Sequence, residues 1–144
     1  MNAMEISRSG LDVEWRRMEV IALNLANINT SSAGGGGGYL PLRLVSGPVG
    51  SFGKALADAG HAEAEAQPQG VRIYGIEPTG QGVRRVYEPG HPHADADGFV
   101  TYPAVSQAEE MTLMVKTARA YEANLVAMAA AQQIYSSALQ IGRQ

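Results

Sequence analysis

The polar residues best suited to do chemistry lie in one short stretch, His91-Pro92-His93-Ala94-Asp95-Ala96-Asp97-Gly98. Imidazole nitrogens and carboxylate oxygens bind divalent metals, so His91, His93, Asp95 and Asp97 are candidate ligands. The alternative is a turn in which the two aspartates accept hydrogen bonds from nearby backbone and Gly98 adopts a positive φ. We favour the turn.

The same stretch fits a calcium loop poorly. With Gly98 at the sixth position, His93 stands first, where an aspartate is wanted. Ala104 then stands twelfth, where a bidentate glutamate is wanted. The sequence therefore predicts no calcium site here.

Other candidate sites also have simpler structural interpretations. The run Gly34 to Gly38 lacks the Gly-Lys-Ser/Thr of a phosphate-binding loop, so we expect a flexible linker. No nucleophile motif surrounds any serine, which argues against a hydrolytic triad. Trp15 and the methionines fall at helical spacing, typical of packing residues, and Arg84-Arg85 with Arg72 suits a solvated strand face. We predict a protein that is not an enzyme, with no catalytic residue, cofactor or metal.

Composition narrows the class further. The 144 residues suffice for one ordinary domain, and the net charge of -3 argues against nucleic-acid or anionic-membrane partners. Without cysteine there are no disulfides or thiolate metal sites. We also expect neither an ordinary secretory signal nor direct membrane insertion, because no suitable apolar run is present.

Two heptad patterns predict the long elements. The first, over about residues 4–28, consists of Met4, Leu11, Trp15, Met18, Ala22 and Leu25. Ser9 with Asp12 resembles a capping box there, although a start near Asn2 with Glu5 reads equally well. The second seam consists of Met111, Met114, Ala118, Tyr121, Leu125, Met128, Gln132, Tyr135 and Leu139.

The C-terminal helix has clear boundaries and a second apolar face. Ser106 and Glu109 form a capping box, Glu109 and Glu110 suit the positive end of the helix dipole, and Gly142 ends a helix over 107–141. The second stripe is Leu113, Ala120, Ala127, Ile134 and Ile141. A helix apolar on two faces belongs inside something larger, so we expect both termini to be partly disordered in the free monomer and to order on assembly.

Between the helices the sequence predicts a small β-rich region. Residues 71–76 and 82–87 alternate with period two around the turn residues Pro78-Thr79-Gly80, so we expect a β-hairpin. A third strand is expected near 99–102, and residues 51–69 read as a loop or a short, weakly held helix. The predicted fold class is α+β, divided into 1–30, 31–103 and 104–144, with the heptad helices forming a coiled-coil layer.

Two segments resemble a known family. Residues 20–30, with Asn24, Ala26, Asn27 and Thr30, resemble the N-x-A-N-x-x-T signature of flagellar rod and hook proteins. Residues 86–100, including Asp95, Asp97 and Gly98, resemble the VYDPGHPDADADGYV stretch of FlgC-like proximal rod proteins, with His93 where aspartate is usual. The match continues through Pro103, Glu109-Glu110-Met111 and residues 119–124, which include Tyr121, Glu122 and Asn124.

The resemblance implies a structural subunit of the bacterial flagellar basal body. It implies export without a cleaved signal peptide through the flagellar type III apparatus, and self-assembly in the periplasm with other rod proteins into the drive shaft that transmits torque for motility. We expect the assembly interface to use Leu11, Trp15, Met18, Leu25, Tyr121, Leu125, Met128 and Tyr135. The alternatives are a small metal-binding enzyme using the His91/His93/Asp95/Asp97 cluster and a dimeric coiled-coil adaptor.

Overall fold

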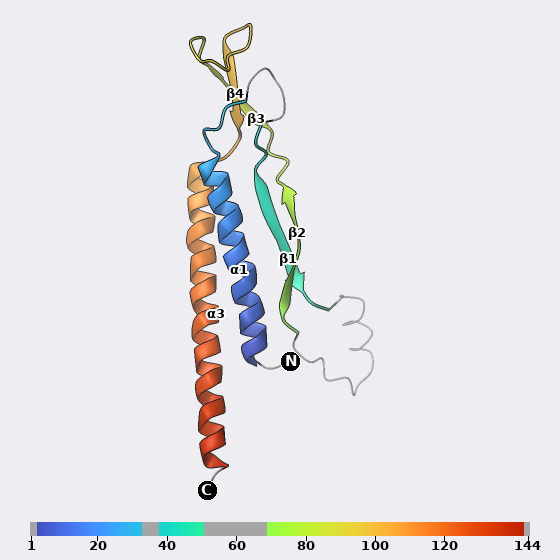
Figure 1. Cartoon of the computed structure of the whole chain (residues 1–144), viewed down its shortest axis with the longest axis vertical. Helices are drawn as coiled ribbons and strands as arrows, with labels where there is room; N and C mark the ends of the chain where they lie inside the picture. The colour runs from blue at the N-terminus through green and yellow to red at the C-terminus, as the bar shows by residue number, and fades with distance from the viewer. Residues whose placement is uncertain (1–2, 33–37, 51–68, 143–144) are drawn as a thin grey trace. The chain divides into compact units, whose positions relative to one another are not determined.

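A computed structural model describes residues 3–32, 38–50 and 69–142 (Figure 1). The elements follow the order α1 (Ala3–Ala26), β1 (Leu42–Pro48), β2 (Val71–Pro78), β3 (Val83–Tyr87), β4 (Phe99–Pro103) and α3 (Gln107–Ile141). The α+β class and both long helices are therefore confirmed. The segments predicted as a glycine linker, 34–38, and as a loop or short helix, 51–69, lie almost entirely outside the described residues.

Both helices begin and end where their local chemistry allows. Ser106 Oγ accepts a hydrogen bond from the Glu109 amide at 3.4 Å, so the predicted N-cap of α3 is present. At the other end, the Gly142 amide donates to the Ala138 carbonyl at 3.1 Å. α1 starts at Ala3 rather than at Ser9, whose hydroxyl donates within the helix to the Ile6 carbonyl. The start near Asn2 is thus the better of the two readings.

The predicted hairpin between residues 71–76 and 82–87 is wrong. β2 pairs with β1, and β3 pairs antiparallel with β4, with Tyr87 opposite Phe99. The Thr79 amide donates to the Pro41 carbonyl at 2.8 Å, which continues the β1–β2 pairing instead of turning the chain back into β3. Alternation identifies a strand locally, but the partner is chosen by packing distant in sequence. The strand predicted near 99–102 is confirmed as β4.

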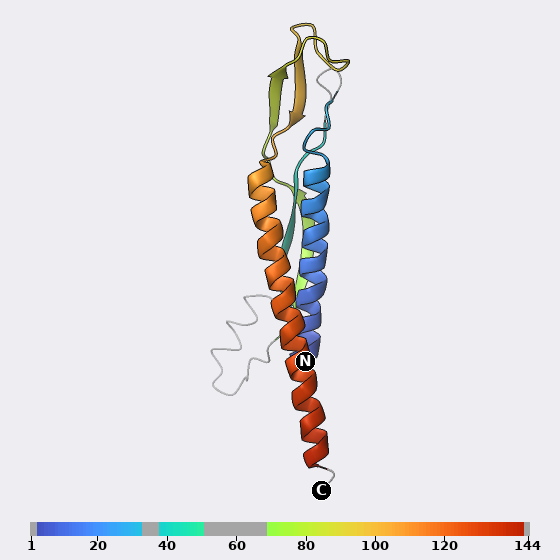
Figure 2. The same ribbon diagram turned by 90° about the vertical axis from the view of Figure 1, so that its left-hand side faces the viewer.

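The chain forms two compact units. One contains Met1–Arg16, Val45–Gly75 and Thr117–Gln144, and its buried apolar side chains among the described residues are Leu11 and Val13. Here the start of α1 lies beside the C-terminal part of α3 in both views (Figures 1 and 2). The other contains Arg17–Leu44 and Ile76–Lys116 and buries Val20, Ile21, Leu44, Val100 and Val105. These small cores leave much of the apolar surface uncovered.

No helix in the described ranges is long and apolar enough to cross a membrane.

Candidate assembly interface

α1 and α3 run antiparallel and meet through a mixed polar and apolar face. In the first unit Trp15 and Tyr121 have ring centroids 6.2 Å apart, and Gly10 lies against the Asn124 side chain. In the second unit Asn24 donates to Glu110 at 3.1 Å. From Gly10 to Trp15 the α1 sequence advances, while its partners on α3 go back from Asn124 to Tyr121, as antiparallel packing requires.

The face that α3 buries is rotated from the predicted seam. Met114, Tyr121 and Met128 are half-buried, as the seam requires, but Met111, Leu125, Tyr135 and Leu139 are exposed. The seam residue Ala118 and, in the second stripe, Leu113 and Ala120 are also half-buried. Another row of buried or half-buried positions lies one residue earlier in each heptad, at Glu110, Thr117, Asn124 and Ala131. Three of these four are polar, so a search for apolar repeats passes over them. The exposed half of the seam stays available to another chain.

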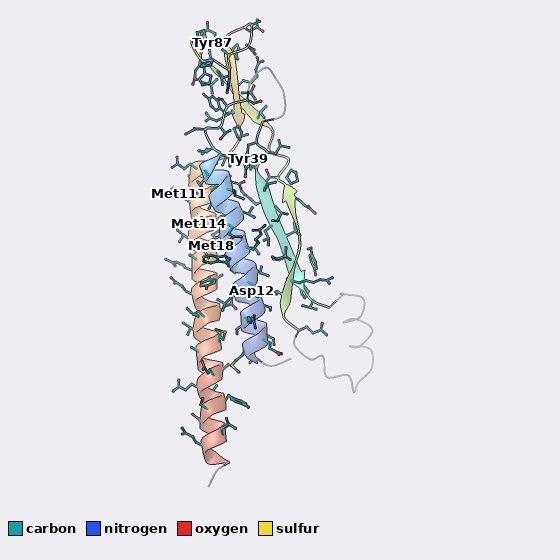
Figure 3. The ribbon with its side chains drawn as sticks, in the orientation of Figure 1. Asp12, Met18, Tyr39, Tyr87, Met111 and Met114 are labelled. Carbon is teal, nitrogen blue, oxygen red and sulfur yellow. The ribbon has the colours of Figure 1, made fainter. Side chains whose placement is uncertain are left out.

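The eight predicted assembly residues divide by exposure. Leu11 is buried in the first unit, at 9% exposed, so its main contribution is to the fold of the chain. Met18, Leu25, Tyr121 and Met128 are half-buried. Trp15, Leu125 and Tyr135 are 57%, 46% and 56% exposed. In Figure 3 the labelled methionines sit on both helices, Met18 on α1 and Met111 and Met114 on α3.

The N-terminal signature residues form the C-terminal turn of α1. The Asn27 amide donates to the Leu23 carbonyl at 3.1 Å, and its side chain donates to the same carbonyl at 2.8 Å. Thr30 Oγ1 donates in turn to Asn27 Oδ1 at 3.1 Å. These bonds satisfy carbonyl groups that a helix end otherwise leaves open. Ala26 is exposed and makes no such contact.

Asn24, the first signature residue, has a different role at the centre of a buried polar cluster. Its side-chain amide donates to the Leu42 carbonyl at 2.9 Å and to Glu110 Oε2 at 3.1 Å. Its oxygen accepts from Tyr39 Oη at 2.7 Å and from the Leu42 amide at 2.9 Å. Both amide hydrogens and both lone pairs are therefore used. Figure 3 shows Tyr39 near the end of α1.

The charges in this cluster are paired. Glu110, 1% exposed, forms an ion pair with Arg43 through its second oxygen. Burial and, secondarily, the Glu110 carboxylate raise the pKa of the Tyr39 phenol, so that it stays protonated and donates to Asn24. Sequence reasoning assigned Glu110 to the helix dipole and overlooked Arg43 and Tyr39. A signal was available in the spacing, because Glu110 stands seven residues before Thr117 and 14 before Asn124, the other polar residues of this face.

The His91–Gly98 stretch is the predicted turn. Asp95 Oδ1 accepts from the Asp97 amide at 3.0 Å and from the Phe99 amide at 2.8 Å, and Arg85 pairs with its other oxygen. The Phe99 amide is the main cause, with Arg85 and the Asp97 amide, of a pKa of Asp95 below its ordinary value. Gly98 has a φ of 81°, and the Asp97 side chain is exposed.

The two histidines also form hydrogen bonds in and beside this turn. His91 Nδ1 accepts from the His93 amide at 3.0 Å, and His93 Nδ1 lies 2.8 Å from Ser31 Oγ. The described residues contain no group of three or more His, Asp or Glu side chains placed to hold a metal ion. The cluster thus holds the β3–β4 ribbon together, and the metal-enzyme alternative gains no support from it.

The C-terminal signature lies on α3. Tyr121 contacts Trp15, Asn124 lies against Gly10 and donates to the Ala120 carbonyl at 2.9 Å, and Glu122 is exposed. Two of the signature residues on α3 therefore contact α1, at Trp15 and Gly10.

Comparison with known proteins indicates the family of this chain. The family model for the flagellar basal body rod FlgEFG protein C-terminal matches residues 96–141, covering β4 and α3. The flagellar basal-body rod protein FlgC of Borreliella burgdorferi is 32% identical over 151 residues, covering 97% of this chain and 95% of that protein.

The chain belongs to the FlgC family.

Other members are similar over nearly their full lengths. The FlgC of Bacillus subtilis is 31% identical over 146 residues, covering 99% of this chain and 97% of that protein. The FlgC of Salmonella typhimurium is 28% identical over 143 residues, covering 99% and 98%. Neither a metal-dependent enzyme nor a dimeric adaptor is supported by this membership.

Proposed function

We propose that this chain is a structural subunit of the flagellar basal-body rod and that it acts mechanically, without catalysis. The single observation that carries the mechanism is the uncovered apolar surface of α3, where Leu125, Val126, Ile134, Tyr135, Leu139 and Ile141 are all at least 46% exposed. Exposed apolar surface on this scale marks an interaction site. Membership of the FlgC family supplies the context, because its members are rod proteins.

The location of this surface suits a helical assembly. In the first unit Gly10 faces Asn124, so with antiparallel helices Ala3 is level with about residue 131 of α3. The last ten residues of α3, 132–141, therefore extend past the described start of α1. These residues are covered in the rod by helices of other subunits, through contacts that repeat from copy to copy and generate an open tube.

The proposal includes the predicted assembly residues and the cellular route. Trp15, Leu125 and Tyr135 make contacts between subunits, while Met18, Leu25, Tyr121 and Met128 serve both the chain and its neighbours. Partners are copies of this chain and other rod proteins, and the subunit reaches the periplasm through the flagellar export apparatus without a cleaved signal peptide. There it transmits torque as part of the drive shaft.

The substitution Leu125→Asp tests this function. Burying a leucine contributes about 1.5–3 kcal/mol, whereas burying an unpaired carboxylate is strongly unfavourable, so rod assembly is lost in the variant. In a strain lacking the native gene, we expect normal export of the variant, no complete basal bodies by electron microscopy and no swimming.

The matched control is Gln133→Asp, which introduces the same charge at an exposed polar position of α3. The strain that carries Gln133→Asp is expected to swim. Normal motility with Leu125→Asp would refute the proposed role of this surface. If neither variant were exported, the defect would lie in export and not in assembly.

A further inference from the structure

The pairing of α1 with α3 must select one register among several similar ones. The apolar positions of both helices repeat every seven residues, and many of those on α3 are alanine. Sliding one helix by a heptad therefore sets apolar residues against apolar residues again. Burial alone discriminates poorly between such registers, and polar residues at buried positions are the usual device that does.

We propose that two contacts pin this register: the hydrogen bond of Asn24 to Glu110 and the fit of the Asn124 side chain against Gly10. The four are positioning residues, and their function is to allow only one alignment of α1 with α3. Gly10 and Asn24 are 14 residues apart in α1, and Glu110 and Asn124 are 14 residues apart in α3, which is two heptads in each helix. Each contact thus specifies the same antiparallel register within its own unit.

The Asn24–Glu110 pin acts through polar satisfaction. Asn24 is fully buried, and all four of its hydrogen-bonding positions are filled by Glu110, Tyr39 and the Leu42 backbone. A slip of seven residues moves Glu110 by about 10 Å along the helix axis. Asn24 would then lack an acceptor for one hydrogen, and the buried carboxylate would lose a donor, which is costly away from water.

The Gly10–Asn124 pin acts through shape. A Cβ added at Gly10 would lie 2.7 Å from Asn124 Oδ1, so the asparagine fills the space that a side chain would need. Gly10 is the single glycine in α1. A slip of seven residues brings Ala3 or Arg17 opposite Asn124, and the Cβ of either would meet its side chain. The two pins use different physics and reject the same slipped alignments.

The absence of cysteine from the sequence makes the register directly measurable. Ile6 lies four residues before Gly10 and Met128 lies four residues after Asn124, so Ile6→Cys with Met128→Cys reports the observed register. Tyr121 lies seven residues before Met128, so Ile6→Cys with Tyr121→Cys reports the slipped one. In the otherwise native chain, we expect disulfide in the first pair in at least about tenfold excess over the second.

A variant with four substitutions then removes both contacts at once: Asn24→Leu, Arg43→Met, Glu110→Leu and Asn124→Ala. Because Arg43 and Glu110 are both replaced, neither is left as an unpaired charge. We expect the two reporters to form disulfide to within about threefold of each other, while the helical circular dichroism is retained. Retention of the tenfold native preference would overturn the proposal.

Should the fourfold variant lose its helical signal, two smaller variants decide. Asn124→Ala alone, and Asn24→Leu with Arg43→Met and Glu110→Leu, each remove one pin, and each should raise the slipped disulfide by at least about threefold. An unchanged ratio in both overturns the proposal. Glu110→Gln, which keeps an acceptor for Asn24, is the conservative control and should retain the native preference.

This inference deepens the proposed function, because the register decides which apolar residues of α3 face other subunits. The two can fail separately. The disulfide ratio is measured on the purified full chain and needs no assembly, whereas the Leu125→Asp experiment is scored on basal bodies and swimming. If the disulfide ratio shows the native register but Leu125→Asp still assembles a rod and swims, the proposed function is refuted and the register proposal stands.

Discussion

At the scale of single residues, hydrogen-bonded polar side chains fix the local arrangement of the chain. Asn24 and Glu110 are among the most buried side chains of the described residues, and each has its hydrogen-bonding groups paired. Asp95 organises the loop between β3 and β4 through two backbone amides. A paired buried polar group adds little net stability, but it penalises every alternative arrangement in which it would be unpaired.

Gly98 gives a prediction at this scale. Its φ of 81° is unfavourable for other residues, and an added Cβ would lie 2.9 Å from the Tyr87 ring and 3.1 Å from Pro89 Cβ. Figure 3 labels Tyr87 in this part of the molecule. We expect Gly98→Ala to lower the free energy of unfolding of the β3–β4 ribbon by about 1–3 kcal/mol.

Amide hydrogen exchange at Val86 and Val100, which oppose each other in the ribbon, measures this loss. The matched control is Gly90→Ala in the same loop, where an added Cβ meets nothing within 4 Å, so its effect should stay within about 0.5 kcal/mol. Equal effects of the two substitutions would show that the backbone conformation at Gly98 is not the cause.

At the scale of elements, the two helices differ in what they bury. Besides Asn24, α1 buries four apolar side chains, those of Leu11, Val13, Val20 and Ile21. Among the described residues of α3, the buried side chains are the polar Glu110 and Thr117. α3 is thus held by a narrow line of contacts along one face. This explains why close approach at small residues such as Gly10 matters for its packing.

The substitution Gly10→Ala tests that close approach. Alanine is favoured over glycine inside a helix by about 1 kcal/mol, so α1 by itself would gain. The added methyl group meets Asn124 at 2.7 Å, however, and overpacking costs about 1–3 kcal/mol. We expect Gly10→Ala to lower the midpoint of thermal unfolding followed by helical circular dichroism.

Combining Gly10→Ala with Asn124→Ala should restore that midpoint, because the clash is removed while the gain in helix propensity remains. Asn124→Ala alone is the control for loss of the asparagine. Additive effects of the two substitutions would contradict a direct contact between these positions.

At the scale of the whole molecule, the described residues expose more large apolar side chains than they bury. A free chain with two such small cores is expected to have marginal stability, because ordering the 35 residues of α3 costs conformational entropy that few buried contacts offset. We propose that assembly into the rod supplies the missing contacts, so that folding of the termini and assembly are linked.

Amide exchange on the dilute, monomeric chain tests this linkage. We expect weak protection across residues 111–139, weakest over 132–139, and protection raised by at least about tenfold in isolated basal bodies. The β3–β4 ribbon serves as the internal control, since its strands pair with each other in the single chain. Strong protection across 111–139 in a true monomer would contradict folding on assembly.

The sequence by itself determined the elements and the family. The capping residues Ser106 and Glu109 and the heptad repeats predicted α3 with its observed bounds. Alternation located β2 and β3 and a third strand was expected where β4 lies, but no strand was predicted at β1. The turn at Asp95 and Gly98 was also predicted, because an aspartate accepting nearby amides and a glycine at positive φ are local chemistry. The signature residues indicated the FlgC family, which the relatives confirm.

The tertiary structure decided which strands pair and which face of α3 is buried. It paired β2 with β1 instead of β3, and it rotated the buried face of α3 onto Glu110, Thr117 and Asn124. Hydrophobic periodicity could not find that face, because polar residues are buried there through partners distant in the sequence, such as Asn24 for Glu110. The sequence pattern predicts which face of a helix a side chain lies on. Whether a polar side chain can be buried there depends on a hydrogen-bond or ion-pair partner, which only the tertiary structure brings close.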